Sequence, residues 1–147
     1  KSLVNAISKN TKTILGVIFD NDDSILFNVD KETGYLSLPS VGEKGEKATT
    51  SNLLKKYQNL GFKTKLDFVY SVYEDKNLDA VCIYYRSKEN ANPPNGSQYI
   101  KFEDISWDKI QDDALVTMLK RYVEESSKEN FAIYMGDETS GFTHKLI

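Results

Sequence analysis

The side chains with the clearest chemical potential lie in one short polar stretch. Lys55, Gln58 and Asn59 are three and four residues apart, which places them on one face if the stretch is helical. Such a face offers one cation and two amides. Glu46 precedes it, but residues 47–66 contain no Asp or Glu. Because Mg²⁺ prefers charged oxygen ligands, we expect no metal site here.

This polar face has two interpretations. In the first, Lys55 does the work of a metal ion and holds a phosphate or an acidic partner directly, and further lysines nearby strengthen the field. These lysines are Lys44, Lys47, Lys63 and Lys65. In the second, the face is simply solvated and has no ligand.

Other reactive residue types are few. Glu103 and Asp104 are adjacent acids that would serve as a relocated catalytic base or metal ligand, or else as solvated charges. Cys82 lies inside an apolar run, which is typical of a buried small hydrophobic residue and not of a nucleophile. His144 is the single histidine, and we expect it at the surface. The sequence contains no P-loop, zinc-ligand spacing or GxGxxG motif.

The elements that must position these residues follow from hydrophobic periodicity and turn signals. Strands are predicted at residues 13–19, 25–29, 35–39, 65–73, 80–86, 98–102 and 131–135, and helices at 48–60 and 107–125. The inward positions of the first helix are predicted to be Leu53, Tyr57 and Leu60, and those of the second Ile110, Leu115, Met118, Leu119 and Tyr122. The continuous apolar run 81–85 favours a strand that is buried on both faces.

This order of elements resembles that of the Nudix hydrolase superfamily over roughly residues 11–125. The segments that carry the resemblance are ILGVIFDNDDSILFNVDKETGYLSLP, VGEKGE, YSVYEDKNLDAVCIYYRS and KFEDISWDKI. It implies an α/β (α+β) fold, a Nudix-type α/β/α sandwich with a mixed central sheet.

The signature of that family, G-x5-E-x7-R-E-U-x-E-E-x-G-U with U apolar, is degenerate here. Aligned on Gly61 and Phe62, Glu46 matches the first Glu, while Ser40 replaces the opening Gly. Leu54 and Lys55 replace Arg-Glu, Lys56 replaces the apolar residue, and Gln58 and Asn59 replace Glu-Glu. The family's carboxylates hold the metal ions that activate water, so their loss predicts a pseudoenzyme.

We therefore expect a catalytically degenerate Nudix-like domain that acts as a ligand-binding or protein-interaction module. The resemblance implies a nucleotide or a nucleoside diphosphate derivative as ligand, bound by Lys55, Gln58, Asn59 and Tyr35, with no cofactor and no metal. The alternative is a divergent pyrophosphohydrolase of nucleoside diphosphate-linked substrates, which would use Mg²⁺ and the acids Glu103 and Asp104 beside the residual Glu46. A third hypothesis is a structural domain without a small-molecule site.

Bulk properties set the remaining expectations. A chain of 147 residues with 39% hydrophobic and 28% charged residues is typical of one globular domain. We divide it into a Nudix-like domain at 1–127 and a C-terminal extension at 128–147, which is a candidate extra edge strand. The net charge of −3 argues against generic nucleic-acid binding, and no apolar run could span a membrane. We expect a cytoplasmic protein, with a homodimer or another protein partner left open.

Overall fold

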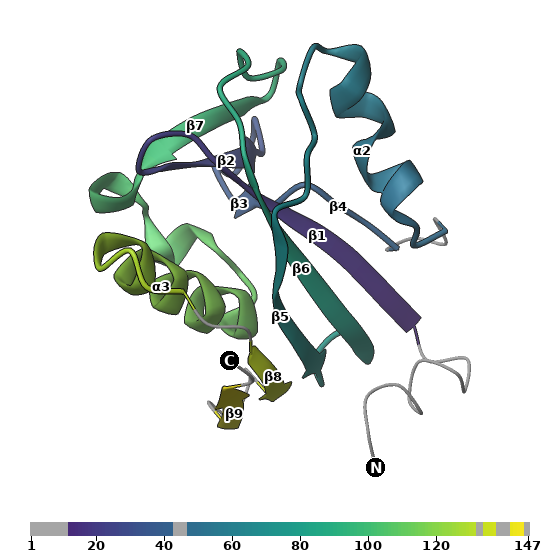
Figure 1. Cartoon of the computed structure of the whole chain (residues 1–147), viewed down its shortest axis with the longest axis vertical. Coiled ribbons are helices and arrows are strands. Elements are labelled where there is room, and N and C mark those ends of the chain that lie inside the picture. The colour runs from purple at the N-terminus through teal and green to yellow at the C-terminus, as the bar shows by residue number, and fades with distance from the viewer. Residues whose placement is uncertain (1–11, 43–46, 132–133, 138–141, 146–147) are drawn as a thin grey trace.

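The computed structural model describes residues 12–42, 47–131, 134–137 and 142–145, and it places one mixed sheet between two helices (Figure 1). The strands are β1 Lys12–Asp20, β2 Ser24–Val29, β3 Leu36–Ser37, β4 Ser40–Val41, β5 Phe68–Asp75, β6 Ala80–Lys88, β7 Ser97–Lys101, β8 Tyr134–Asp137 and β9 Phe142–Lys145. The helices are α2 Thr50–Asn59, η1 Phe102–Asp104, η2 Trp107–Lys109 and α3 Asp113–Ser127. The predicted α/β/α sandwich with a mixed sheet is confirmed.

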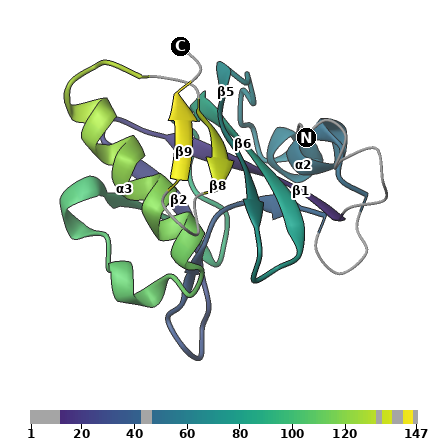
Figure 2. The same cartoon turned by 90° about the horizontal axis from the view of Figure 1, so that it is seen from below.

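A parallel pair of long strands, β1 and β6, forms the centre of the sheet. The strand order is β3-β2-β1-β6-β5-β8-β9, with β4 paired to β1 and β7 paired to β2. Lys12 to Asp20 pair in register with Ala80 to Lys88, so both strands end at the same edge. Beyond β5, strand β8 runs parallel to β5 and β9 pairs antiparallel to β8 (Figure 2).

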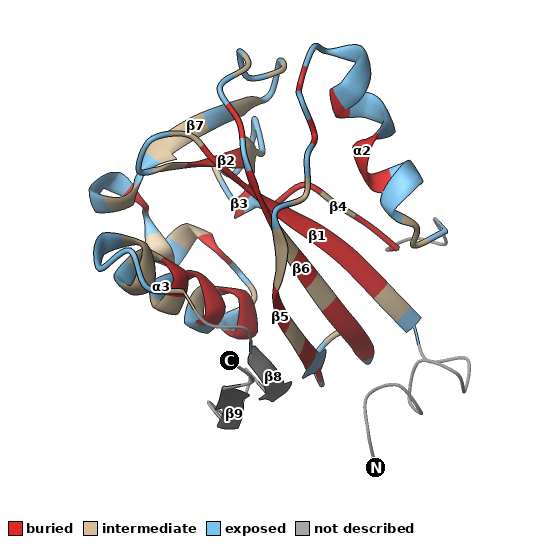
Figure 3. Ribbon diagram, viewed as in Figure 1, coloured by how far each residue is buried: buried red, intermediate tan, exposed pale blue. Residues whose placement is uncertain are grey.

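Two hydrophobic cores flank the central strands (Figure 3). Residues 14–20 of β1 are all buried. Ile14 and Ile18 pack with α3 residues such as Leu119, whereas Val17 and Phe19 pack on the α2 side. The alternation of a strand therefore sends successive apolar side chains into opposite cores, which explains why these strands read as continuous apolar runs.

Helix α2 is close to its predicted range, but the face that it buries is not quite the predicted one. Thr49 begins it, because the Thr49 hydroxyl accepts a hydrogen bond from the Asn52 N–H at 3.0 Å, an N-cap. The buried residues are Leu53, Leu54 and Tyr57. The prediction that Leu60 points inward is wrong: its side chain is 47% exposed, because the helix ends at Asn59 and Leu60 lies in its C-cap.

Two other predicted elements are interrupted. The strand predicted at 35–39 is shorter in the structure, where β3 covers only Leu36–Ser37. Pro39, which has no N–H to donate to a ladder, separates it from β4, which lies beyond the predicted range. The helix predicted at 107–125 becomes η2 followed by α3, and Asp112 caps α3 by accepting the Ala114 N–H at 3.0 Å. The five predicted inward residues of this region are all buried.

Among the described residues, none of the helices combines the length and the apolar character that a membrane-spanning segment requires. Glu46 lies outside the described residues.

Candidate functional site

A cavity of about 600 Å³ opens where β1 and β6 end side by side. Asp20 is the last residue of β1 and Lys88 is the last residue of β6, and these two residues pair in register. The turn after β1, the segment that contains Lys63 and the C-terminal end of α3 complete the lining. Ligands of open α/β sheets commonly bind beyond the carboxyl ends of strands, so this position is a natural candidate site.

Arg86 is the fixed cation of the cavity. Its side chain is 11% exposed, and its Nε lies 3.0 Å from Oδ2 of Asp67. The guanidinium also lies over two aromatic rings, 4.7 Å from the centre of Phe68 and 5.2 Å from that of Phe131. An arginine held by a carboxylate and by ring faces presents its remaining N–H groups in a defined orientation.

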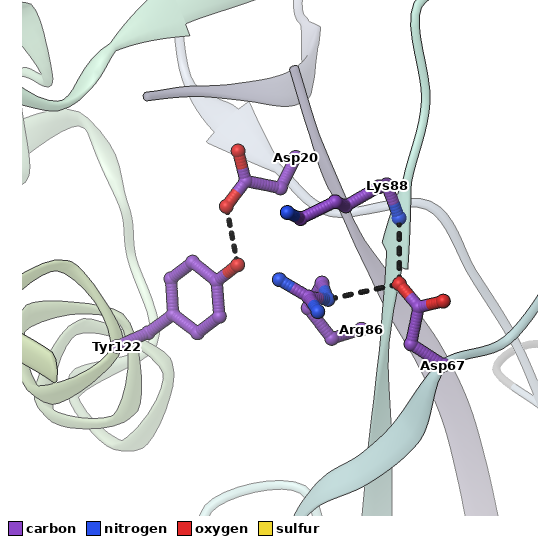
Figure 4. Close-up of polar contacts among 5 residues, drawn as sticks. All are labelled: Asp20, Asp67, Arg86, Lys88 and Tyr122. Carbon is purple, nitrogen blue, oxygen red and sulfur yellow. Dashed lines mark hydrogen bonds and ion pairs between the residues drawn. The ribbon is translucent and has the colours of Figure 1, made fainter. Parts of the chain in front are cut away.

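A buried pair borders the same space. The hydroxyl of Tyr122, from α3, donates a hydrogen bond to Oδ2 of Asp20 (Figure 4). Burial raises the pKa of the Asp20 carboxyl, although this hydrogen bond and the charge of Arg86 oppose the rise. Burial and the nearby Asp20 also raise the pKa of Tyr122, which keeps the phenol protonated and able to donate.

Two lysines add mobile positive charge. The side chain of Lys88 extends toward the space between Asp20 and Arg86 (Figure 4), and the Lys88 backbone N–H donates to Asp67 at 3.0 Å. Lys63 enters the lining from the segment after α2. Among the described residues, neither lysine side chain forms an ion pair, so both ammonium groups are available to an anionic ligand.

Acidic groups line the cavity as well. Asp22, Asp23 and Glu129 are exposed at its mouth, whereas Glu89 is 4% exposed and accepts the Thr64 N–H at 2.9 Å. A ligand here therefore meets cations together with hydrogen-bond acceptors. This combination suits a molecule that carries both anionic groups and hydroxyl or amino donors.

A second cavity of about 540 Å³ lies beside β2, β7 and the segment 104–109. Val29, Leu36 and Ile100 give it apolar walls, and Lys101 and Lys109 contribute charge. Tyr35 is 40% exposed next to it, and the ammonium of Lys109 lies 5.9 Å from the centre of its ring.

Known proteins resemble this chain in sequence and, separately, in structure. No protein-family model matches the sequence. A probable flavin reductase from Rhizobium meliloti is 30% identical over 132 residues, which cover 90% of this chain and 42% of the relative. The reductase component of a flavin-dependent trigonelline monooxygenase from Acinetobacter baylyi is 24% identical over 100% of this chain and 46% of its own length. The chain thus spans less than half the length of these curated relatives.

Solved structures decide the fold. A NUDIX hydrolase from Nitrosomonas europaea superposes with a TM-score of 0.70 at 19% identity, over 88% of this chain and 79% of that one. The chain has a Nudix-like fold. An ADP-ribose pyrophosphatase from Streptococcus suis (TM-score 0.64, 14% identity, 87% and 100% coverage) and a putative oxidoreductase from Sinorhizobium meliloti (0.67, 23%, 85% and 43%) are also similar.

The residues predicted from the Nudix resemblance do not gather in these cavities. Lys55, Gln58 and Asn59 are exposed on α2, and none of the three lines either cavity. Asp104 lines the second cavity, and Glu103 is exposed beside it in η1. Within the described residues, no group of three or more His, Cys, Asp or Glu side chains could hold a metal ion.

Arg86 and Lys88, which line the first cavity, and Asp67 and Tyr122, which contact lining residues, were not predicted as site residues from the sequence. One signal for two of them exists, because Arg86 and Lys88 directly follow the apolar run of a central strand, where strand ends commonly carry binding groups. Cys82 is buried, as predicted. His144 falls in β9, and its side chain lies outside the described part of the structure.

Proposed function

We propose that this Nudix-like chain is a non-catalytic module that binds a nucleotide-like anion in the cavity at the ends of β1 and β6. The observation that carries the proposal is the meeting of Arg86, Lys63 and Lys88 at one cavity, with both lysines unpaired among the described residues. Lysine and arginine side chains contact phosphate oxygens directly, so such a site needs no metal.

The composition of α2 supports the non-catalytic part of the proposal. In Nudix hydrolases the corresponding helix supplies carboxylates to metal ions, whereas α2 reads TSNLLKKYQN and contains no acid. Its exposed face carries Lys55, Gln58 and Asn59 instead. Neutral amides and a cation make a poor Mg²⁺ site.

The ligand class follows from the mixed lining of the cavity. Phosphate groups would contact the cations, while ribose hydroxyls or base amino groups would donate to Asp22, Asp23 or Glu129. The relatives are described as a flavin reductase and a reductase component, and the chain matches less than half of each. We therefore extend the proposal to a ligand-sensing part of a longer flavin reductase-type protein.

A thermal-shift experiment with ADP and with inorganic pyrophosphate, each in EDTA and in Mg²⁺, tests the proposal. A ligand at ~100 times its dissociation constant stabilises by about 2.7 kcal/mol, or roughly 5–10 °C in Tm for a chain of this size. We expect a metal-independent shift that Lys88→Glu abolishes. Lys55→Glu, which makes the same charge change on the exposed face of α2, should leave the shift intact.

Three results would overturn the proposal in different ways. Loss of the shift in Lys55→Glu with retention in Lys88→Glu would move the site to α2. A shift only with Mg²⁺, together with phosphate release, would establish a hydrolase. No shift with either probe would leave the domain without the proposed anion site.

A further inference from the structure

A pair of aspartates joins the end of β5 to the start of α3, away from the cavity described above. Asp75 is 1% exposed, and its Oδ1 accepts the N–H groups of Asn77 at 3.0 Å and Leu78 at 3.2 Å. Oδ1 of Asp112 accepts the N–H of Ala114 at 3.0 Å. Because each carboxyl group is tied to the backbone of its own turn, neither can rotate away from the other without losing these hydrogen bonds.

The second carboxyl oxygen of Asp75 lacks a hydrogen-bond donor. Oδ2 of Asp75 is buried and receives no hydrogen bond from any N–H or O–H of the described residues. The carboxyl group of Asp112 lies within hydrogen-bonding contact of Asp75. Two carboxylates can only accept hydrogen bonds, so this contact is repulsive unless one of the groups is protonated. A proton on Asp112 would remove the repulsion, and Oδ2 is the Asp75 oxygen that still lacks a donor.

The environment favours that protonated state. Burial, the hydrogen bond to Asp75 and the charge of Asp75 raise the pKa of Asp112 to about 7, against an ordinary value of 3.8. The buried groups that face the pair are Tyr73 of β5 and, beside Tyr73, Cys82 and Tyr84 of β6, none of which brings a positive charge.

Lys109, three residues before Asp112, is half-buried, and its ammonium lies 5.9 Å from the centre of the Tyr35 ring. The other charged residues nearest in sequence are exposed. They are Glu74, Lys76 and Asp79 around the β5–β6 turn and Asp113 in the first turn of α3. Water screens exposed charges of this kind.

We propose that Asp75 and Asp112 share one proton that fastens the start of α3 to the end of β5, and that α3 packing is therefore sensitive to pH near neutrality. Deprotonation leaves two facing carboxylates, and their repulsion loosens the first turn of α3. The shared proton between Asp75 and Asp112 does not depend on any ligand in the cavity.

The sign of the effect follows from proton linkage. The carboxyl pKa of Asp112 is higher in the folded state than in the unfolded chain, so the folded state binds more protons between pH 3.8 and about pH 7. The stabilisation is therefore complete below the unfolded value and is lost as pH rises through the folded value.

The test compares wild type with Asp112→Asn in urea unfolding between pH 6 and pH 8. The asparagine keeps an oxygen for the Ala114 N–H and supplies a permanent N–H donor to Oδ2 of Asp75. We expect the unfolding constant of the wild type to rise roughly 3- to 10-fold over this range, and that of Asp112→Asn to change much less. Amide exchange in the first turn of α3 should accelerate with pH beyond its intrinsic rate in the wild type alone.

Asp113→Asn is the matched control, because it removes the same charge one residue further along on the exposed side of α3 and should keep the wild-type pH dependence. Equal pH dependence in wild type and Asp112→Asn would overturn the proposal. If Asp112→Asn does not fold, Asp75→Asn makes the same comparison with donor and acceptor exchanged. Carbon NMR titration of the wild type decides independently, since an Asp112 carboxyl that titrates near its ordinary value excludes a shared proton.

Discussion

Arg86 illustrates how a single buried charge depends on its partner. Its guanidinium is almost completely removed from water, and Asp67 is its carboxylate partner in the ion pair. A buried ion pair adds little net stability by itself, but removing one member leaves the other charge uncompensated in a poorly solvated site. Asp67 also accepts the backbone N–H of Lys88, so it contacts two of the three cationic residues of the proposed site.

We expect Asp67→Asn to lower the free energy of unfolding by about 1–3 kcal/mol, because the buried Arg86 then loses the carboxylate that lies 3.0 Å from its Nε. Glu124→Gln is the matched control: it breaks the Lys128–Glu124 pair, whose side chains are 69% and 70% exposed, and should cost no more than about 0.5 kcal/mol. Urea denaturation of both variants measures the difference. Equal losses would show that Asp67 does not compensate a buried charge.

At the residue scale, the sequence predicted which side chains are buried better than it predicted which side chains contact each other. The burial of Cys82 and of the inward α3 residues follows from local periodicity. The contact between Asp20 and Tyr122 joins residues 102 positions apart, and no local pattern indicates it. For the same reason, the sequence suggested Lys55, Gln58 and Asn59, which are neighbours within one helix, as ligand-binding residues. That suggestion stays a prediction, and Arg86 was not among the residues suggested.

Among the elements, the short strand β4 brings the chain very close to the backbone of β1. Ser40 and Val41 pair with Gly16 and Leu15, and Gly42 follows with a φ of +113°. A Cβ atom on Gly42 would lie 2.1 Å from the carbonyl oxygen of Thr13. Both the backbone conformation and the space therefore require glycine at this position.

We expect Gly42→Ala to destabilise the protein by about 3 kcal/mol or more, because the clash is with backbone that is part of the central strand. Gly34→Ala separates the two causes: Gly34 also has a positive φ of +76°, but nothing lies within 4 Å of the position that an alanine methyl group would take there. That control should cost only about 1 kcal/mol. Thermal unfolding of the two variants is the measurement, and similar losses would mean that β4 moves aside easily.

Errors in the predicted elements have local causes. One predicted strand ends early, before Pro39, and an aspartate cap starts α3 later than its apolar pattern suggests. The pattern of α2 was assigned from Leu53, Tyr57 and Leu60, yet Leu54 is buried and Leu60 is not. Ten residues make fewer than three turns, so the periodicity alone could not fix which face would meet the sheet.

At the scale of the whole molecule, the central strands couple the two cores. Leu53 and Leu54 of α2 pack into one core, and Met118 and Leu119 of α3 pack into the other. Both cores are completed by alternate side chains of the same strand, β1. If β1 leaves one core, it also leaves the other. We therefore expect the α2 side and the α3 side of the sheet to unfold together.

Leu53→Ala tests this coupling, because Leu53 is 2% exposed on the α2 side and its truncation should cost roughly 2–5 kcal/mol. The single tryptophan, Trp107, packs against the core on the α3 side, so its fluorescence reports the opposite face. We expect Leu53→Ala to lower the urea midpoint of Trp107 fluorescence as much as that of far-UV circular dichroism. Leu119→Ala, a buried leucine on the α3 side, serves as the comparison and should also shift both midpoints together. A Leu53→Ala variant that loses helical signal at low urea while Trp107 fluorescence stays native would contradict the coupling, since α2 could then detach from a sheet that α3 still holds.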